Sequence, residues 1–410
     1  METHLADWIK GTHDGDEAES ILRACVHCGF CNATCPTYQI LGDELDGPRG
    51  RIYQIKQVLE GVTPTRSTQL HLDRCLTCLN CETTCPSGVR YGRLVDIGRA
   101  EVDKQVPREP LDSGRRGLLR FALTRHWIFD PAVIVGRALL PILPAGVRKK
   151  LAPLREPGVT PKNTRARKVI MLNGCVQPGL IPAIDAATAR VLDKLGVQSI
   201  VAAESGCCGA IDYHMNAHDA AREKMRRNID AWWPLIEAGA EAIVINASGC
   251  GAMLKEYAHA LRDDAAYAEK AVRVVTMTRD VSEFLASATD QLAARCPHDT
   301  KPRIAFHPPC TLQHTQKIRG VVESILIALG ADLVPVPDSH LCCGSAGTYS
   351  ILQPELSQQL RARKLENLQS GNPDLILSAN IGCLSHLETG TPIPVRHWIE
   401  WVDQRIGGTA

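Results

Sequence analysis

Cysteine is the residue type whose number and spacing could do chemistry in this chain. The sequence has 17 cysteines in 410 residues, and eight of them form two short runs near its start. The runs consist of Cys25, Cys28, Cys31 and Cys35 before Pro36, and of Cys75, Cys78, Cys81 and Cys85 before Pro86. Each reads C-x2-C-x2-C-x3-C-P, and the second repeats the first after 50 residues. Three thiolates on a tightly curled segment, with a fourth from elsewhere, are the ligands of a [4Fe–4S] cluster.

The fourth cysteine of each run lies too far along the chain to join its own three, and the following proline turns it away. The spacing is that of bacterial ferredoxins, in which the fourth cysteine ligates the other cluster. We therefore predict two clusters, one on Cys25, Cys28, Cys31 and Cys85, and the other on Cys75, Cys78, Cys81 and Cys35. Two zinc sites are the alternative, but zinc is held by separated C-x2-C pairs rather than by triple runs.

A second cysteine repeat occupies the rest of the chain. Each half has a cysteine, a vicinal pair 32 residues later that precedes a glycine, and a further cysteine, namely Cys175, Cys207, Cys208 and Cys250, then Cys310, Cys342, Cys343 and Cys383. This recurrence predicts a third iron–sulfur or metal centre in at least one half. The alternative is that they are packing cysteines on glycine-rich turns. Among the nearby histidines His307, His314, His340 and His386, we take His386 as the best ligand candidate, since it follows Cys383 by three residues.

The elements that must position these cysteines alternate between short apolar runs and helical stretches. We expect strands at 169–172, 199–202, 242–245, 303–306, 332–335 and 375–377, and helices near 183–195, 216–236, 318–329 and 355–368. Such alternation favours parallel sheets covered by helices, whose strand ends place ligands. The predicted fold class is therefore mixed α+β and α/β. A helical, dicluster ferredoxin-like domain precedes two pseudo-repeated α/β cysteine-rich (CCG) domains.

Charge separates these parts and excludes some functions. Between Lys104 and Lys168 there are 15 Lys and Arg but only four Asp and Glu, and the segment is rich in Pro and Gly. We predict a cluster domain at 1–103, a basic linker at 104–167, and CCG domains at 168–300 and 301–410. The whole chain carries a net charge of only +1 and 4% aromatic residues, so we expect no nucleic-acid partner. Neither a secretory leader nor a membrane span is visible.

Motifs for organic cofactors and for hydrolysis are missing. There is no G-x-G-x-x-G opening a helix after a strand, no phosphate-binding G-x4-G-K-[ST], no G-x-S-x-G and no H-E-x-x-H. We predict no catalytic residue. Clusters without an organic cofactor imply a partner that performs the chemistry.

Four segments carry a resemblance to a known family: ILRACVHCGFCNATCPTYQILGDELDGPRGRIYQIKQVLEG, HLDRCLTCLNCETTCPSGVRY, NIDAWWPLIEAGAEAI and PDSHLCCGSAGTYS. Over essentially its whole length the chain resembles the iron–sulfur subunits of bacterial glycolate oxidase (glycolate dehydrogenase). The resemblance implies a non-catalytic electron-transfer subunit of an oxidoreductase complex. Flavin-binding partner subunits would oxidise glycolate to glyoxylate, and this chain would pass the electrons to a quinone or another acceptor. It also implies a cytoplasmic location, peripherally associated with the inner face of the cell membrane.

Related families share the same combination of motifs. They include iron–sulfur subunits of D-lactate and glycerol-3-phosphate dehydrogenases, and heterodisulfide-reductase-like thiol or quinone reductases with chemistry at the CCG cysteines. In the heterodisulfide reductases the pattern ends in C-x2-C, whereas Met253 and His386 stand at the last position here. A five-thiolate centre is therefore not expected, although four thiolates remain in each half.

Two further readings stay open at the level of sequence. In one, Cys207, Cys208, Cys342 and Cys343 are themselves the reactive groups of a thiol–disulfide or quinone-reducing enzyme. In the other, the C-terminal half is a docking module, and apolar residues of the linker such as Phe121 and Trp127 lie on anionic lipid. A solvated linker held against the cluster domain is the simpler interpretation of the same segment.

Overall fold

The computed structural model describes residues 1–142, 155–297 and 302–408. The chain forms two compact units, one of residues 1–117, 214–216 and 340–364, and one of residues 118–213, 217–339 and 365–410. The first unit thus includes a segment from the second cysteine repeat, which carries Cys342 and Cys343. The predicted domain boundary at 300/301 and residues 143–154 of the predicted linker lie outside the described residues.

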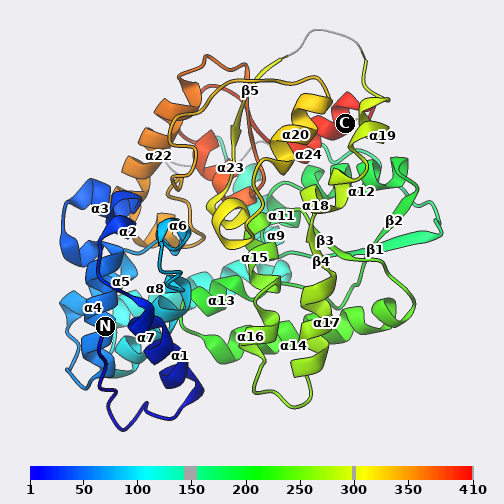
Figure 1. The fold of residues 1–410 in the computed structure, drawn as a ribbon. Coiled ribbons are helices and arrows are strands. Elements are labelled where there is room, and N and C mark those ends of the chain that lie inside the picture. Colours follow the sequence, from blue (N-terminus) through cyan, green and yellow to red (C-terminus); the bar gives the residue numbers. More distant parts are fainter. Residues whose placement is uncertain (143–154, 298–301, 409–410) are drawn as a thin grey trace. The chain divides into compact units, whose positions relative to one another are not determined.

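The first unit is helical, and no strand occurs among its described residues (Figure 1, blue and cyan for its N-terminal part). Its elements are α1 (His13–Ala24), α2 (Phe30–Ala33), α3 (Pro36–Leu41), η1 (Glu44–Asp46), α4 (Pro48–Leu59), α5 (Arg66–Asp73), α6 (Asn80–Thr84), α7 (Tyr91–Gln105) and α21 (Tyr349–Leu352). Helices α8 (Pro110–Leu123) and α22 (Pro354–Gln369) begin in this unit and end in the second.

The core of the first unit lies where α4 meets α7. A Cβ at Gly98 of α7 would come within 2.5 Å of the Ile55 side chain of α4, so only glycine permits this approach. Ile55 and Leu94 are fully buried in the same cluster. The start of the predicted basic linker is fixed to this unit, because Arg108 and Arg116 both pair with Asp73 at the end of α5, at 2.7 and 3.0 Å.

The second unit contains two parallel four-stranded sheets with the same strand order. In the first sheet the order is β2 (Val197–Val201), β1 (Arg167–Met171), β3 (Ile243–Ile245), β4 (Thr278–Asp280); in the second it is β6 (Asp332–Leu333), β5 (Arg303–His307), β7 (Leu375–Ser378), β8 (Val395–His397). Registers such as Ile170 against Ile243 and Ile304 against Leu375 align matching strands. All three residues of β3 are buried, as expected for a strand covered on both faces.

Helices accompany both sheets (Figure 1). They are α9 (His126–Ala138), α11 (Gln177–Leu180), α12 (Ala183–Lys194), α13 (Ala210–His214), α14 (His218–Glu237), α15 (Ser248–Leu254), α16 (Tyr257–Ala260), α17 (Ala268–Met277), α18 (Val281–Ala286), α19 (Thr289–Ala293), the π-helix η2 (Thr311–Thr315), α20 (Val321–Ala328), α23 (Ile381–Glu388) and α24 (Trp398–Arg405). The predicted fold class, a helical domain with two repeated α/β domains, is confirmed.

The two sheets meet at the loops that follow equivalent strands. After β3, the N–H of Ser248 donates to the carbonyl of Ala379, which follows β7, at 3.1 Å. The Ser248 hydroxyl also lies 2.8 Å from that of Thr311 after β5. The cysteine-bearing strand ends of the two repeats therefore adjoin within this unit. Among the residues that the structure describes, no helix has the length and apolar content needed to cross a bilayer.

Candidate iron–sulfur centres

The first cavity of the N-terminal unit is lined by Cys25, Cys28, Cys31 and Cys85, together with Cys81. The loop between α1 and α2 turns sharply, with His27 at φ 56° and Gly29 at φ 83°. Glycine adopts that left-handed conformation without steric cost. The side chain of Cys28 is exposed, while Cys25 is buried.

The second cavity is lined by Cys35, Cys75, Cys78 and Cys81. Its loop repeats the turns of the first after 50 residues, because Thr77 has φ 53° and Leu79 has φ 57°. The second run has leucine where the first has glycine, so the shape of the loop is kept at a local conformational cost. Each cavity thus has three cysteines from one run and the fourth cysteine of the other run, and Cys81 lines both cavities.

Two arginines and a tyrosine surround Cys75. Arg51, whose side chain is buried, lines the second cavity beside Tyr91. Arg99 donates to the Cys75 carbonyl at 2.6 Å. The Cys75 sulfur accepts hydrogen bonds from the Tyr91 hydroxyl at 3.5 Å and from the Thr77 N–H at 3.4 Å. Neither arginine is signalled by any motif in the sequence.

The thiols in the two cavities differ in their readiness to ionise. Burial raises the pKa of Cys25, raises that of Cys31 to about 11, and raises that of Cys81 well above its usual value. Burial opposes ionisation of Cys75 as well, but the charges of Arg51 and Arg99 outweigh it, so its pKa falls below the usual value.

This donor set fits an iron–sulfur cluster. Several buried thiolates close together repel one another and are stable only around a cation or a metal cluster. In the first cavity the mutual repulsion of Cys25, Cys31 and Cys85 adds to the burial that opposes ionisation. Each cavity is lined by the four cysteines that a cubane requires. Three of the four come from one closely spaced run of the sequence.

The first cysteine-rich repeat brings its four cysteines together at the carboxyl edge of its sheet. Cys175 follows β1, the pair Cys207-Cys208 follows β2, and Cys250 follows β3. The Cys207 sulfur is hydrogen bonded to Cys175 and Cys208, and Cys208 in turn to Cys250. Because two thiols donate to it, Cys207 has a pKa well below the usual value, while hydrogen bonding and burial raise the pKa of Cys175 and Cys208.

The cysteines of the second cysteine-rich repeat belong to different compact units. In the second unit, a ring nitrogen of His307 lies within 4.8 Å of the Cys383 sulfur. Among the described residues, His307 at the end of β5, rather than the expected His386, is thus the histidine grouped with a cysteine as a possible metal ligand. Its Nδ1 lies 3.0 Å from the hydroxyl of Ser378. Cys310 follows the same strand β5.

In the first unit, Cys342 and Cys343 lie in a buried turn. The Gly344 N–H donates to the Cys342 sulfur at 3.4 Å. Burial raises the pKa of the Tyr349 hydroxyl, and the negative charges of Cys75 and Cys342 raise it further. That hydroxyl donates to the carbonyl of Arg74, the residue before Cys75, at 3.1 Å. The vicinal pair therefore lies in the same neighbourhood as the second cavity.

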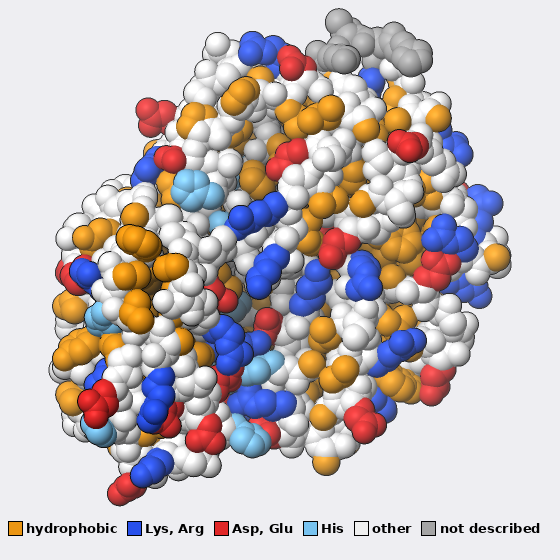
Figure 2. Space-filling model, viewed as in Figure 1, with side chains coloured by type: hydrophobic (Ala, Val, Ile, Leu, Met, Phe, Trp, Pro, Cys, Tyr) orange, Lys and Arg blue, Asp and Glu red, His pale blue; other side chains and the backbone are white. Residues whose placement is uncertain are grey.

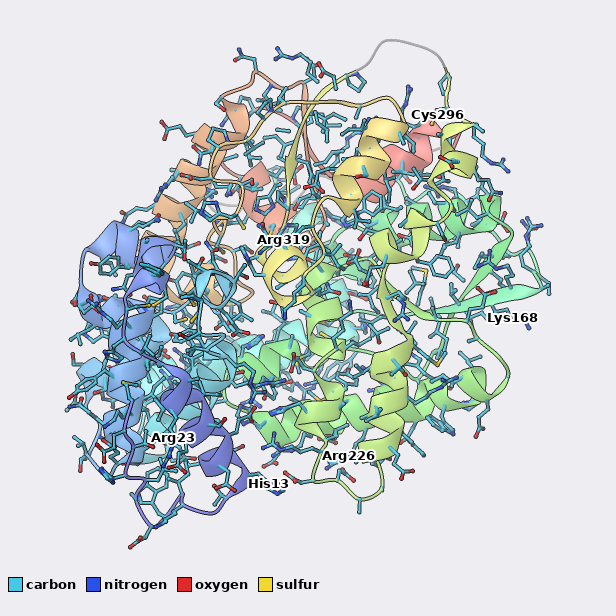
Figure 3. All side chains as sticks on the ribbon, in the orientation of Figure 1. His13, Arg23, Lys168, Arg226, Cys296 and Arg319 are labelled. Carbon is cyan, nitrogen blue, oxygen red and sulfur yellow. The ribbon has the colours of Figure 1, made fainter. Side chains whose placement is uncertain are left out.

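The seventeenth cysteine belongs to neither repeat. Cys296 follows α19, and its thiol donates to the carbonyl of Leu292 at 3.6 Å (Figure 3). It contributes to neither of the cavities described above.

Comparison with known proteins agrees with this arrangement. Residues 21–89 match the family model of a 4Fe–4S dicluster domain, and residues 169–255 and 304–388 each match that of a cysteine-rich domain. The fold and the two cavities thus belong to a dicluster iron–sulfur protein with a duplicated cysteine-rich domain. The predicted pair of [4Fe–4S] clusters is confirmed at the level of the domain.

Individual relatives place the chain in a narrower family within this class of iron–sulfur proteins. The chain is 54% identical over 408 residues, 99% of both chains, to the glycolate oxidase iron-sulfur subunit of Escherichia coli (strain K12). It is 29% identical to the probable glycolate oxidase iron-sulfur subunit of Bacillus subtilis (strain 168), over 92% of this chain and 90% of that one. Lactate utilization protein A of Geobacillus thermodenitrificans (strain NG80-2) is also 29% identical, over 58% of this chain and 99% of its own length. The chain belongs to the family of glycolate oxidase iron–sulfur subunits.

Proposed function

We propose that the chain is the electron-transfer subunit of a glycolate-oxidising complex. Its clusters would take electrons from a partner flavoprotein that converts glycolate to glyoxylate, and pass them to a quinone or another acceptor. The family assignment supports this role, as does the absence of any organic-cofactor motif from the sequence. The substrate would then be recognised on another chain.

The single observation that carries the proposal is the crossed lining of the two cavities. We assign Cys25, Cys28, Cys31 and Cys85 to one cluster, and Cys75, Cys78, Cys81 and Cys35 to the other. The first set lines one cavity and the second set lines the other. Cys81 borders both, so the two clusters would be separated by little more than one side chain. Short separation favours transfer of an electron between them.

The exposed side of the first cavity is where we propose that the flavoprotein docks. Cys28 is exposed, and the neighbouring Val26 and Phe30 are 68% and 61% exposed. Figure 2 shows hydrophobic side chains gathered over α2 and α3 on this unit. Exposed apolar residues around a redox centre are typical of a protein interface. A Phe30→Glu variant should keep its iron yet be reduced more slowly by the partner.

Metal analysis and electron paramagnetic resonance (EPR) on the anaerobically purified chain test the main proposal. We expect about eight irons on the eight N-terminal cysteines, two reducible cluster signals from them, and no glycolate oxidation in the absence of partners. Replacing Cys85 by Ser should disturb the cluster of the first run, and replacing Cys35 by Ser that of the second run. A chain that binds zinc without reducible iron would overturn the proposal. A matched Cys296→Ser control should leave both signals intact.

We also propose a third metal or cluster centre on Cys175, Cys207, Cys208 and Cys250. The hydrogen-bonded chain of these four thiols supports it, since only converging sulfurs form such a chain. A Cys207→Ser variant should lose the iron or spectral signal that exceeds that of two cubanes. Equal iron in this variant and the wild type would contradict the third centre.

Cys310, Cys342, Cys343 and Cys383 are the equivalent set of the second half. We propose that they hold a further centre, to which His307 is a better candidate ligand than His386. Replacement of Cys342 and Cys343 by Ser also tests the reductase reading. Loss of quinone reduction with both ferredoxin-type signals intact would favour chemistry at these cysteines, and full activity would exclude it.

Peripheral membrane contact is proposed for α9 and the end of α8. Helix α9 buries Val133 and exposes Trp127, Ile134 and Val135, which are 72%, 65% and 55% exposed. Phe121 of α8 packs edge-on against Trp127, with ring centres 6.1 Å apart. The basic composition of residues 104–168 would complement anionic lipid.

Flotation with vesicles of anionic phospholipid tests this contact. Trp127→Gln and Ile134→Gln should each reduce binding several-fold. Ile327→Gln, which alters an exposed apolar residue elsewhere, should not. If the α9 variants bind the vesicles as well as the wild type does, α9 does not contact lipid. Its exposed apolar face would then be a contact site for a protein partner.

A further inference from the structure

The two cavities of the N-terminal unit differ in the charge placed beside them. The side chain of Arg51 is 1% exposed and Arg99 is buried, and both lie near Cys75. Arg99 donates to the carbonyls of Leu72 and Cys75 at 2.8 and 2.6 Å. These contacts fix one positive charge against the backbone of the cysteine loop.

Arg51 is held on the other side of the same loop. It donates to the carbonyl of His71 at 2.7 Å, to the hydroxyl of Thr37 at 3.2 Å and to the carboxylate of Asp46 at 3.3 Å. Asp46 is fully buried and also accepts from Arg74 at 2.9 Å. One carboxylate therefore faces more than one guanidinium, and positive charge is left in excess around the second cavity.

Hydrogen bonds to sulfur act in the same direction. The Tyr91 hydroxyl and the Thr77 N–H both donate to the Cys75 sulfur. The His27 N–H gives Cys25 the counterpart of the Thr77 bond, so the Tyr91 bond is the one that sets Cys75 apart from Cys25. Donors of this kind stabilise additional negative charge on the sulfur. In a poorly solvated site, both the charges and the hydrogen bonds act more strongly than they would in water.

The first cavity has no comparable excess of buried positive charge. Its arginine, Arg49, is 37% exposed and is neutralised by Glu44 at 2.6 Å. The Met1 ammonium donates to the Cys25 carbonyl at 2.9 Å, at a partly exposed site. Cys28 itself is open to solvent. Water and salt therefore screen the charges near this cavity.

We propose that the two clusters have unequal reduction potentials, and that Arg51, Arg99 and Tyr91 make the cluster on Cys35, Cys75, Cys78 and Cys81 the more oxidising one. The inference rests on the proposed function. Reduction adds one electron, and hence one negative charge, to a cluster. Burial alone would disfavour that added charge, but the buried guanidinium groups and the sulfur hydrogen bonds offset it. Electrons would then be held preferentially at the second cavity, whose cysteine loop is contacted by Tyr349 through the carbonyl of Arg74.

A potentiometric titration of the full chain, followed by EPR, tests the order of potentials. The wild type should show two separate one-electron steps. Tyr91→Phe removes one hydrogen bond to sulfur, and Arg99→Gln removes one charge. Both should move only the higher step to more negative potential, Arg99→Gln by at least a tenfold change in the ratio of reduced to oxidised cluster, or 59 mV. Arg99→Lys, which keeps the charge, should recover most of that shift.

The matched control is Arg49→Gln, at the screened first cavity, which should leave the higher step in place. If the higher step moves with Arg49→Gln and not with Tyr91→Phe, the order is reversed and the inference fails. It fails equally if neither Tyr91→Phe nor Arg99→Gln moves any step while the iron content stays at the wild-type level. If Arg99→Gln does not retain iron, Tyr91→Phe decides alone. A wild type without reducible iron would instead refute the proposed function.

Discussion

The side-chain amide of Asn228 donates a hydrogen bond to the carbonyl of Cys207 at 3.0 Å. The oxygen of the same amide accepts from the Gly206 N–H at 2.8 Å, so a residue of α14 holds the loop of the vicinal cysteines at two points. Tyr257 completes this support by donating to the Cys208 carbonyl at 2.9 Å. The thiols of the first cysteine-rich repeat are thus placed by buried polar groups that no cysteine motif reveals.

Replacing Asn228 by Ala should destabilise the second unit. Asn228 is fully buried, and its loss leaves the Gly206 N–H and the Cys207 carbonyl without these partners. Each such group costs about 1–3 kcal/mol. Urea unfolding followed by tryptophan fluorescence should show a lower midpoint. Asn163→Ala, at an exposed site, is the control and should unfold like the wild type; an unchanged Asn228→Ala midpoint would contradict the bracing role.

Replacing Gly344 by Ala should displace the Cys342-Cys343 turn. Gly344 has φ 86°, and an added Cβ would lie 2.6 Å from the carbonyl oxygen of Ser357 and 2.8 Å from Leu360. Gly347→Ala provides the matched control, because Gly347 has φ 62° but no atom within 4 Å of the added Cβ. We expect the Gly344 variant to melt several degrees below the control. Equal melting temperatures would show that the turn has room to adjust.

Replacing Asp46 by Asn should strongly destabilise the first unit. The Asp46 carboxylate is buried and accepts from Arg51 and Arg74. Removing one partner of a buried ion pair costs about 3–5 kcal/mol, since the other charge stays buried. Denaturant unfolding measures the loss. Glu19→Gln breaks the exposed pair with Arg23 and should have no measurable effect. A mild Asp46→Asn phenotype would mean that solvent reaches Arg51.

Acid should destabilise the second unit through His397. Burial lowers the pKa of this histidine to about 3 in the folded chain, against an ordinary 6.5. Below pH 6.5 His397 is protonated in the unfolded chain but stays neutral in the folded chain. Stability is therefore lost as the pH falls towards 3. At pH 5 the loss is about 2 kcal/mol.

The measurement compares urea midpoints at pH 7 and pH 5. His397→Asn keeps an acceptor for the Ile399 N–H that begins α24, and should lose less stability on acidification. Asp280 works in the opposite direction, because burial raises its pKa to about 6 and stability rises as that carboxyl is protonated below pH 6. Asp280 is common to both proteins, so the comparison isolates His397. Equal acid sensitivity would exclude His397 as the source.

The two repeats could be predicted from the sequence, because the spacing of their cysteines and the apolar runs of their central strands are visible in short segments of the chain. The predicted strands at 303–306 and 375–377 correspond to β5 (Arg303–His307) and β7 (Leu375–Ser378), whose interiors are apolar. The strands β4, with sequence Thr-Arg-Asp, and β8, with Val-Arg-His, are three residues long and largely polar. They form through pairing with β3 and β7, and a single-sequence pattern does not contain that information.

At the candidate sites too, residues close in sequence could be predicted, whereas residues brought together by tertiary packing could not. The spacing of Cys75, Cys78 and Cys81 predicts their convergence, because all three lie within one short segment, a loop and the first turn of α6. Arg51 and Arg99 come from helices elsewhere in the sequence, and only tertiary packing brings them beside that loop. Sequence proximity to Cys383 favours His386, whereas His307 lies near that cysteine because β5 pairs with β7.

The exchange of Cys35 and Cys85 between the two cavities also has a consequence for biosynthesis. Cys85 lines the cavity of the first run, and Cys35 lines that of the second. While the nascent chain is shorter than 81 residues, neither cavity has all four of its cysteines, so a protein that delivers preassembled clusters has no complete site, and the first cavity stays incomplete until Cys85 is made. With the proposed ligands, both clusters would be inserted only after the two runs have packed together, and a chain that ends between the runs would hold neither cluster.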